Sequence, residues 1–120
     1  MRLFMVPLIA FGMIAVDQPD EPSESAMRAA FELRLAAQVE SAMDFLAETQ
    51  GPEAVERVRQ AGTDQFTVRN FTKRDCQRGD NGYICAFAVD LAVVNGTIQQ
   101  TVRGRFSPAP DGRLTFTQES

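Results

Sequence analysis

"GYICAFAVDLAVVNGTIQQTVRGRF", from Gly82 to Phe106, decides the fold of this chain. Apolar and polar side chains alternate on both sides of the dipeptide Asn95-Gly96. Such alternation is typical of a half-buried β-strand, and Asn-Gly between two such runs is a strong hairpin signal. The sequence therefore predicts two antiparallel strands, 83–94 and 97–106, joined by a two-residue turn.

This turn also predicts a register, in which Val94 faces Thr97. One face of the hairpin then carries the pairs Val93–Ile98, Leu91–Gln100, Val89–Val102, Phe87–Gly104 and Cys85–Phe106. The other face carries the small and polar pairs Ala92–Gln99, Asp90–Thr101, Ala88–Arg103 and Ala86–Arg105. We expect the first face to contact the core and the second to contact solvent.

Two more strands flank the hairpin. In "QFTVRNFT" (65–72) the alternation breaks at Phe71, which predicts a β-bulge near Asn70. After the loop "SPAPDG", the run "RLTFT" (113–117) points Leu114 and Phe116 inward. Together the four runs predict an antiparallel meander.

The first half of the chain is helical in pattern. From Ala26, with Ser23 or Ser25 as N-cap, apolar residues recur at steps of three and four over about 24 residues; they are Met27, Phe31, Leu35, Val39, Ala42, Met43 and Leu46. Gly51 ends this helix, and "PEAVERVRQA" is a short second one. We expect an α+β domain, in which a long N-terminal helix plus a short helix pack on the four-stranded antiparallel meander sheet.

Two cysteines lie nine positions apart, Cys76 and Cys85, on either side of the turn-forming residues 79–82. An even cysteine count in an exported chain favours a disulfide. A metal site would need more ligands, and a redox pair normally reads C-x-x-C. The spacing therefore predicts a structural disulfide near the end of the first hairpin.

The N-terminus has the outline of a secretory signal: Arg2, an uncharged and mostly apolar run over 3–16, then the polar stretch "DQPDEPSES". Ala15 suits the cleavage position, whereas Met13 fits the −3 position poorly. The run is short for a bilayer span, but an uncleaved anchor or a terminal core element are the alternatives. We expect a signal peptide at 1–16, a linker at 17–25 and a single domain at 26–120, placed in the periplasm or secreted.

The residue types offer little for catalysis. The chain has no His, and no nucleophile-elbow or phosphate-loop pattern. We predict no catalytic residue, metal or cofactor. A net charge of −4 argues against nucleic-acid binding. The outer sheet face is the candidate binding face, with an Asp90–Arg103 ion pair expected across it; its residues are Arg69, Lys73, Asp90, Arg103 and Arg105.

Gln100, Val102 and Gly104 match the Q-x-V-x-G pattern of the cystatin protease inhibitors. With the helix-before-sheet order and the disulfide, the chain resembles the broad cystatin-like or nuclear-transport-factor-like α+β fold. In cystatins the motif forms a hairpin loop and a second loop carries a Pro-Trp pair. Here the motif lies inside a predicted strand, and the chain has no Trp. The resemblance thus implies a fold and not protease inhibition.

Two function classes remain. The first is a non-catalytic binding module whose partner is another envelope protein. The second is a small-ligand protein with a pocket lined by Phe31, Leu35, Phe87, Val89 and Phe106. Oligomeric state stays open, and membrane contact is expected only through an uncleaved leader.

Overall fold

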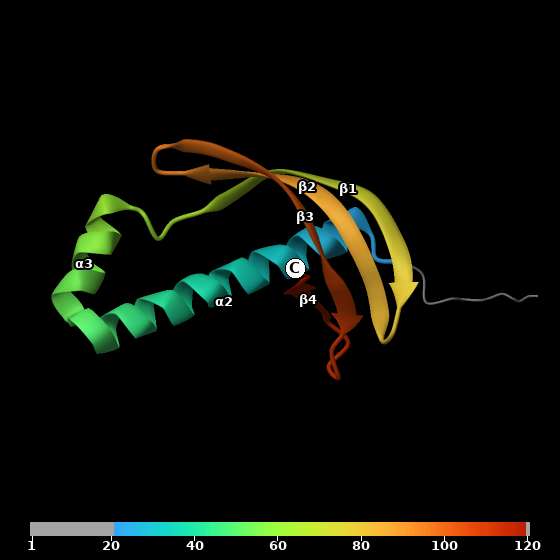
Figure 1. Cartoon of the computed structure of the whole chain (residues 1–120), viewed down its shortest axis with the longest axis horizontal. Coiled ribbons are helices and arrows are strands. Elements are labelled where there is room, and N and C mark those ends of the chain that lie inside the picture. Colours follow the sequence, from blue (N-terminus) through green and yellow to red (C-terminus); the bar gives the residue numbers. More distant parts are fainter. Residues whose placement is uncertain (1–20, 120) are drawn as a thin grey trace, which may run out of the picture.

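A computed structural model describes residues 21–119. Helices α2 (Glu24–Gln50) and α3 (Pro52–Ala61) precede the strands β1 (Thr67–Gly79), β2 (Gly82–Val93), β3 (Gly96–Pro108) and β4 (Leu114–Gln118). The strands form one antiparallel sheet in the order β1-β2-β3-β4, with α2 across one face (Figure 1). The predicted α+β class and meander topology are confirmed. The expected leader at 1–16 and most of the linker at 17–25 lie outside the described residues.

The ends of the helices follow from their local sequence. Ser23 caps α2, and its hydroxyl accepts a hydrogen bond from the Ala26 amide at 3.1 Å, so the helix begins two residues before Ala26. Gly51 ends it with φ 91°, and Pro52 occupies the first turn of α3. Neither helix combines the length and apolar character needed to cross a membrane, within the part of the chain that the structure describes.

Strand β1 is longer than predicted, because it continues to Gly79 and pairs with β2 along its whole length. The bulge expected near Asn70 is present, with Arg69 as the extra residue. A second bulge has Arg74 as its extra residue. The sequence did not indicate a strand over residues 73–78, because this charged stretch shows little alternation of apolar and polar residues.

The predicted register of the β2–β3 hairpin is wrong by two residues. Val93 faces Gly96, and Val94 and Asn95 occupy the turn. An Asn-Gly turn of type I′ needs positive φ at both central residues. Asn81 is the only non-glycine with positive φ among residues 21–119, so Asn95 does not adopt that conformation. A shift of two keeps every side chain on its predicted face, because side chains alternate with a period of two.

The core is a cluster of phenylalanine rings between α2 and the sheet. Phe87 is fully buried, and its ring centroid lies 4.5 Å from that of Phe71 and 5.2 Å from that of Phe31. Phe106 and Phe116 complete the cluster from β3 and β4, with centroids 4.9 Å apart. These five rings come from α2 and from each of the four strands, so they hold helix and sheet together.

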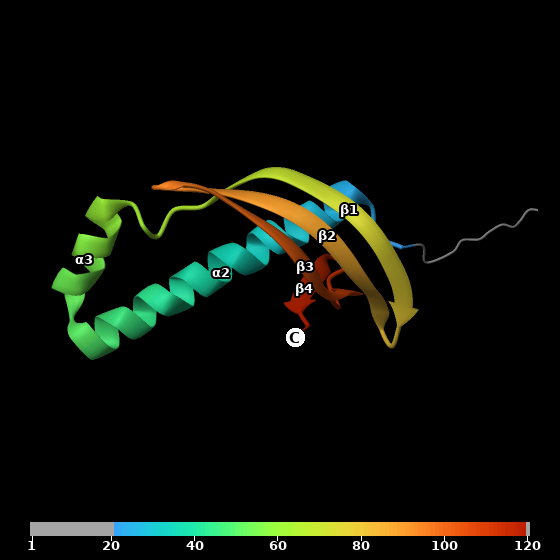
Figure 2. The same cartoon turned by 45° about the horizontal axis from the view of Figure 1, so that its top comes forward.

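The prediction that the whole apolar stripe of α2 covers the sheet is only partly correct. Met27, Ala30 and Phe31 are buried against it, whereas Val39, Met43 and Leu46 are only half-buried. In both views α2 and the sheet diverge toward the end of α2 that leads into α3 (Figures 1 and 2). A straight helix of 27 residues, about 40 Å long, matches a strongly twisted sheet over only part of its length.

The predicted disulfide is confirmed. Cys76 and Cys85 face each other directly across β1 and β2, three pairs from the Gly79–Gly82 end of that hairpin. Cys85 is fully buried beneath the ring cluster, and Cys76 is half-buried. The bond therefore ties one edge strand to the centre of the core.

We expect the double variant Cys76→Ala/Cys85→Ala to lose about 2–3 kcal/mol of unfolding free energy, because the unfolded chain is no longer cross-linked. Urea denaturation followed by circular dichroism measures the loss. Wild-type protein reduced with dithiothreitol is the matched control, since it loses the bond without losing side-chain atoms. An unchanged unfolding free energy after reduction would contradict the prediction.

Candidate functional site

The proposed binding face does not assemble as predicted. The two-residue register shift places Arg103 opposite Ala86, and Asp90 opposite Gln99. Asp90 and Arg103 are thus four residues apart along the sheet, about 13 Å, which is too far for the expected ion pair. The Asp90 carboxylate instead accepts a hydrogen bond from Asn70 Nδ2 at 2.8 Å. This contact links β1 to β2 beside the first bulge.

Lys73 lies on the helix side of the sheet, contrary to the prediction. Its cross-strand neighbour is buried Phe87, and its ammonium contacts the Glu21 carboxylate at 2.6 Å. The ammonium also donates to the Pro22 carbonyl at 2.8 Å. Lys73 follows buried Phe71 by two positions with no bulge between them, so it shares the face of Phe71. Lys73 anchors the chain that enters α2.

The Arg105 side chain also makes contacts within the chain. It donates to the Asp80 carbonyl at 2.7 Å and lies 3.9 Å from a Glu119 carboxylate oxygen. Arg69 and Arg103 remain exposed on β1 and β3. Asp90, Arg103 and Arg105 thus share the outer face, as predicted, but Asp90 and Arg105 are held in contacts within the chain and Lys73 lies on the other face.

The pocket expected among core side chains is filled. Phe87 contacts both Phe31 and Phe106 edge to face, and Val89 is 1% exposed. Leu35 alone of the five predicted lining residues faces the open space beside α2. A small molecule has no room where the sequence placed it.

The motif Gln100, Val102 and Gly104 lies in the middle of β3, as predicted, and not in a loop. Val102 and Gly104 are buried. Gly104 faces Cys85 and not Phe87, and the space left by its missing side chain is filled by Phe116. The glycine is thus explained by packing between β3 and β4.

The β3–β4 turn carries an acidic side chain with a shifted pKa. Asp111 has a pKa below its ordinary value, chiefly because its carboxylate accepts a hydrogen bond from the Arg113 amide. The guanidinium of Arg113 adds to this effect. Both residues lie on the exposed β3–β4 turn, so their contacts stabilise that turn. Within residues 21–119, no three carboxylate or cysteine side chains gather as a metal site would require.

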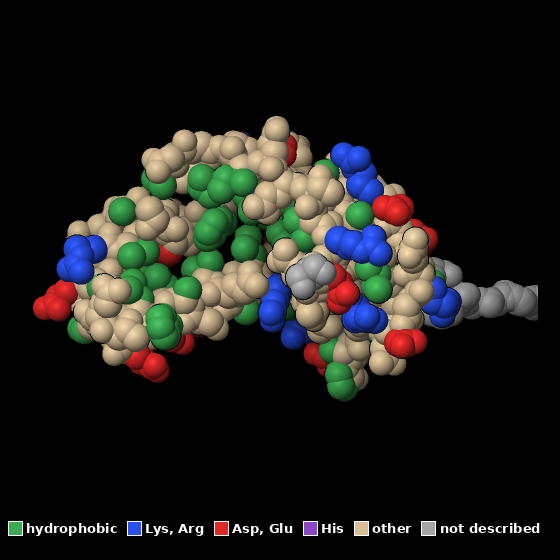
Figure 3. Space-filling view, viewed as in Figure 1, with side chains coloured by type: hydrophobic (Ala, Val, Ile, Leu, Met, Phe, Trp, Pro, Cys, Tyr) green, Lys and Arg blue, Asp and Glu red, His purple; other side chains and the backbone are tan. Residues whose placement is uncertain are grey.

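An open groove runs along the second half of α2, where helix and sheet diverge. One wall is the part of the apolar stripe that leaves the sheet, and the other is the segment 63–68 between α3 and β1. The residues that line it on α2 include Leu35, Val39, Ala42, Met43, Phe45 and Leu46. Figure 3 shows green apolar side chains around a hollow between α2 and the tip of the β2–β3 hairpin. We call this feature the α2 groove.

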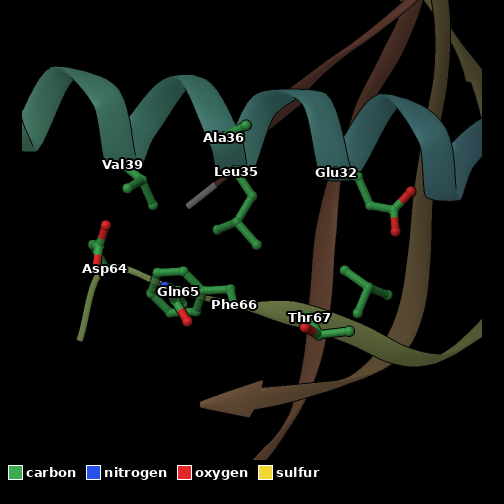
Figure 4. Close-up of a pocket in the computed structure, with 9 residues that line it drawn as sticks. Glu32, Leu35, Ala36, Val39, Asp64, Gln65, Phe66 and Thr67 are labelled. Atoms are coloured by element: carbon green, nitrogen blue, oxygen red, sulfur yellow. The ribbon is translucent and has the colours of Figure 1, made fainter. Parts of the chain in front are cut away.

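The middle of the α2 groove is drawn in Figure 4. Leu35 and Val39 project from α2 toward the ring of Phe66, and Glu32 and Asp64 lie at opposite ends of this row. The Arg28 guanidinium contacts Glu32 at 3.5 Å. One carboxylate oxygen of Asp64 is buried without a hydrogen-bond partner among the described residues. The groove therefore combines apolar side chains of α2 with the acidic side chains of Glu32 and Asp64.

Exposed apolar side chains concentrate at the same end of the molecule. Phe45 is 66% exposed and Phe66 38%, and both line the α2 groove. Val94 and Ile98 are 54% and 42% exposed at the tip of the β2–β3 hairpin. Sequence reasoning assigned the stripe of α2 to the core and missed this surface. The signal in the sequence was the length of that stripe, which is more than one sheet face can cover.

Comparison with known proteins adds no relative: the chain matches no protein-family model, no curated protein and no solved structure. Its function must therefore be argued from its own surfaces.

Proposed function

We propose that this chain is a small exported protein that binds another protein of the cell envelope and catalyses no reaction. The observation that carries the proposal is the α2 groove, an apolar surface that no described part of the chain covers. Contiguous exposed apolar surface is typical of protein-binding sites. Its occupant is an apolar segment of the partner protein.

The charge of the groove refines the chemistry of that segment. Glu32 and Asp64 are the charged residues that line it, and both are acidic. Asp64 is half-buried beside Phe66, and Glu32 is exposed at the other end of the row. A lysine or arginine beside the apolar residues of the partner would complement these two carboxylates. We therefore propose an apolar segment with a basic residue.

Export is part of the proposal and rests on two features. The N-terminal sequence has the order of a secretory signal, and the disulfide suits an oxidising compartment such as the periplasm or the exterior. The fold-level resemblance to the cystatin-like and nuclear-transport-factor-like group is proposed on the same footing, since the helix-then-meander order supports it.

A second candidate function is the binding of a small apolar molecule in the same groove. The section between Leu35 and Val58 encloses about 430 Å³ and is lined mainly by apolar side chains, which is within the usual range for ligand sites. This candidate predicts a copurifying small molecule in the native mass spectrum. The groove is open along its side, which favours a macromolecular segment.

We expect Val39→Asp to abolish capture of the envelope partner, with at least a tenfold loss of the captured band, because it places a charge in the middle of the α2 groove. Leu33→Asp is the matched control: Leu33 is 53% exposed on α2 and does not line the groove. The measurement is affinity capture from an envelope extract with wild type and both variants. Equal capture by Val39→Asp and wild type would refute the proposal.

A further inference from the structure

Within residues 21–119, no strand pairs with the outer edge of β3 over the half nearest the β2–β3 turn. Strand β4 pairs with β3 only from Gly104 to Pro108, and the Glu119 amide adds a last bond to the Arg103 carbonyl. Pairing with β2 has no register shift, so the N–H and C=O groups of every second residue point to this edge. The Arg103 carbonyl points to this edge, because it accepts the hydrogen bond from the Glu119 amide. The outward groups before Arg103 are therefore those of Thr97, Gln99 and Thr101.

This edge has none of the features that protect exposed strands. Natural edges are blunted by charges, prolines, bulges or a covering segment. The run "TIQQTV" (97–102) has no charge and no proline, and residues 96–101 are all exposed. An uncharged edge with β-forming residues is a template for another strand.

The opposite edge of the same sheet is protected in three ways. Two bulges interrupt β1, and each adds an arginine, Arg69 and Arg74. The backbone N–H of Lys73 donates to the Glu24 carboxylate at 2.8 Å, so α2 caps that edge from the side. The chain thus blocks one edge and leaves the other open, which is the pattern expected where one edge has a partner.

We propose that the partner on this edge is a second copy of the chain, paired antiparallel through β3 about a two-fold axis at Gln99. In that register Thr97 faces Thr101 of the second copy and Gln99 faces itself. All three outward residues then exchange both of their hydrogen bonds. Shifting the register by one pair toward β4 would demand the Arg103 carbonyl, which already accepts the Glu119 amide.

The chemistry of the strand suits self-association. No charged side chain lies between Gly96 and Val102, so the two-fold axis brings no like charges face to face. Ile98, which is 42% exposed, gains Gln100 of the second copy as a neighbour on the inner face. The outer edges left in the dimer are the blunted β1 and the five-residue β4, so the assembly closes at two chains. The proposed dimer uses β3 and does not depend on the partner proposed for the α2 groove.

The test uses the full chain with its disulfide intact, as recovered from an exporting host, and two variants of one residue. Gln99→Pro removes an N–H that the monomer does not use, and with it both bonds of the central pair. Gln99→Ala changes the side chain and keeps the N–H. Light scattering after size exclusion, from about 10 to 500 µM, should show a dimer for wild type and Gln99→Ala. Gln99→Pro should weaken the dimer at least tenfold.

Amide hydrogen exchange provides a second measurement that needs no variant. The amides of Thr97, Gln99 and Thr101 should gain protection as wild-type concentration rises, while that of Gln100, bonded to β2, should not change. A wild type that stays monomeric at 500 µM overturns the proposal. So does a dimer that survives Gln99→Pro, or one lost in Val39→Asp with no concentration-dependent protection on β3, which would place the interface in the α2 groove.

Discussion

The variant Phe87→Ala is expected to lose about 3–5 kcal/mol of unfolding free energy, because it removes the central ring of the core and leaves a cavity. Phe87 is fully buried and contacts four other rings, those of Phe31, Phe71, Phe106 and Phe116. These come from α2, β1, β3 and β4. A cavity here therefore loosens every contact between helix and sheet at once.

Domains of this size are stable by only about 5–15 kcal/mol, so the change should be visible as a fall in melting temperature of about 15 °C or more. Urea denaturation and thermal melting measure it. Phe45→Ala is the matched control, since it removes the same ring from a side chain that is 66% exposed, and we expect a change below about 1 kcal/mol. Equal losses in the two variants would show that the ring cluster is not the core.

The variant Gly104→Ala is expected to cost about 3 kcal/mol or more, although it adds a single methyl group. A Cβ at this position would overlap the ring of Phe116 and lie 2.7 Å from the Thr117 carbonyl oxygen. The ring is buried and the carbonyl belongs to the backbone of β4, so neither can move without breaking the pairing of β3 with β4. Overpacking of a closed core site typically costs about 1–3 kcal/mol, and contact with backbone places this case at the upper end.

Two variants test the steric reason. Gly79→Ala is the control, because its nearest neighbours are flexible side-chain atoms of Arg105 and Ile84 at 3.4–3.5 Å; we expect a change below about 1 kcal/mol. In the double variant Gly104→Ala/Phe116→Leu, the smaller side chain should recover part of the loss. Urea denaturation of all three variants measures these changes in unfolding free energy. A Gly104→Ala protein as stable as wild type would contradict the observed packing of Phe116.

Local sequence determined the elements of this protein and the faces of its strands. Ser23, Gly51 and Pro52 set the helix ends because caps and breakers act within one turn. The alternation in β2 and β3 placed Phe87, Val89 and Val102 in the core, and this survived a wrong register, since a slip of two residues preserves the face. The disulfide followed from two cysteines flanking a turn.

The tertiary structure alone decided the surfaces on which function depends. The turn conformation at Asn95 fixed which residues face each other across β2 and β3, and this separated Asp90 from Arg103. The bulge at Arg69 placed Phe71 and Lys73 on the face toward the helix. The α2 groove exists because a straight helix and a twisted sheet diverge after Leu35. The edge of β3 before Gly104 is open because the pairing with β4 begins at Gly104. Twist, bulges and strand ends are set by contacts between distant segments, which no local pattern records.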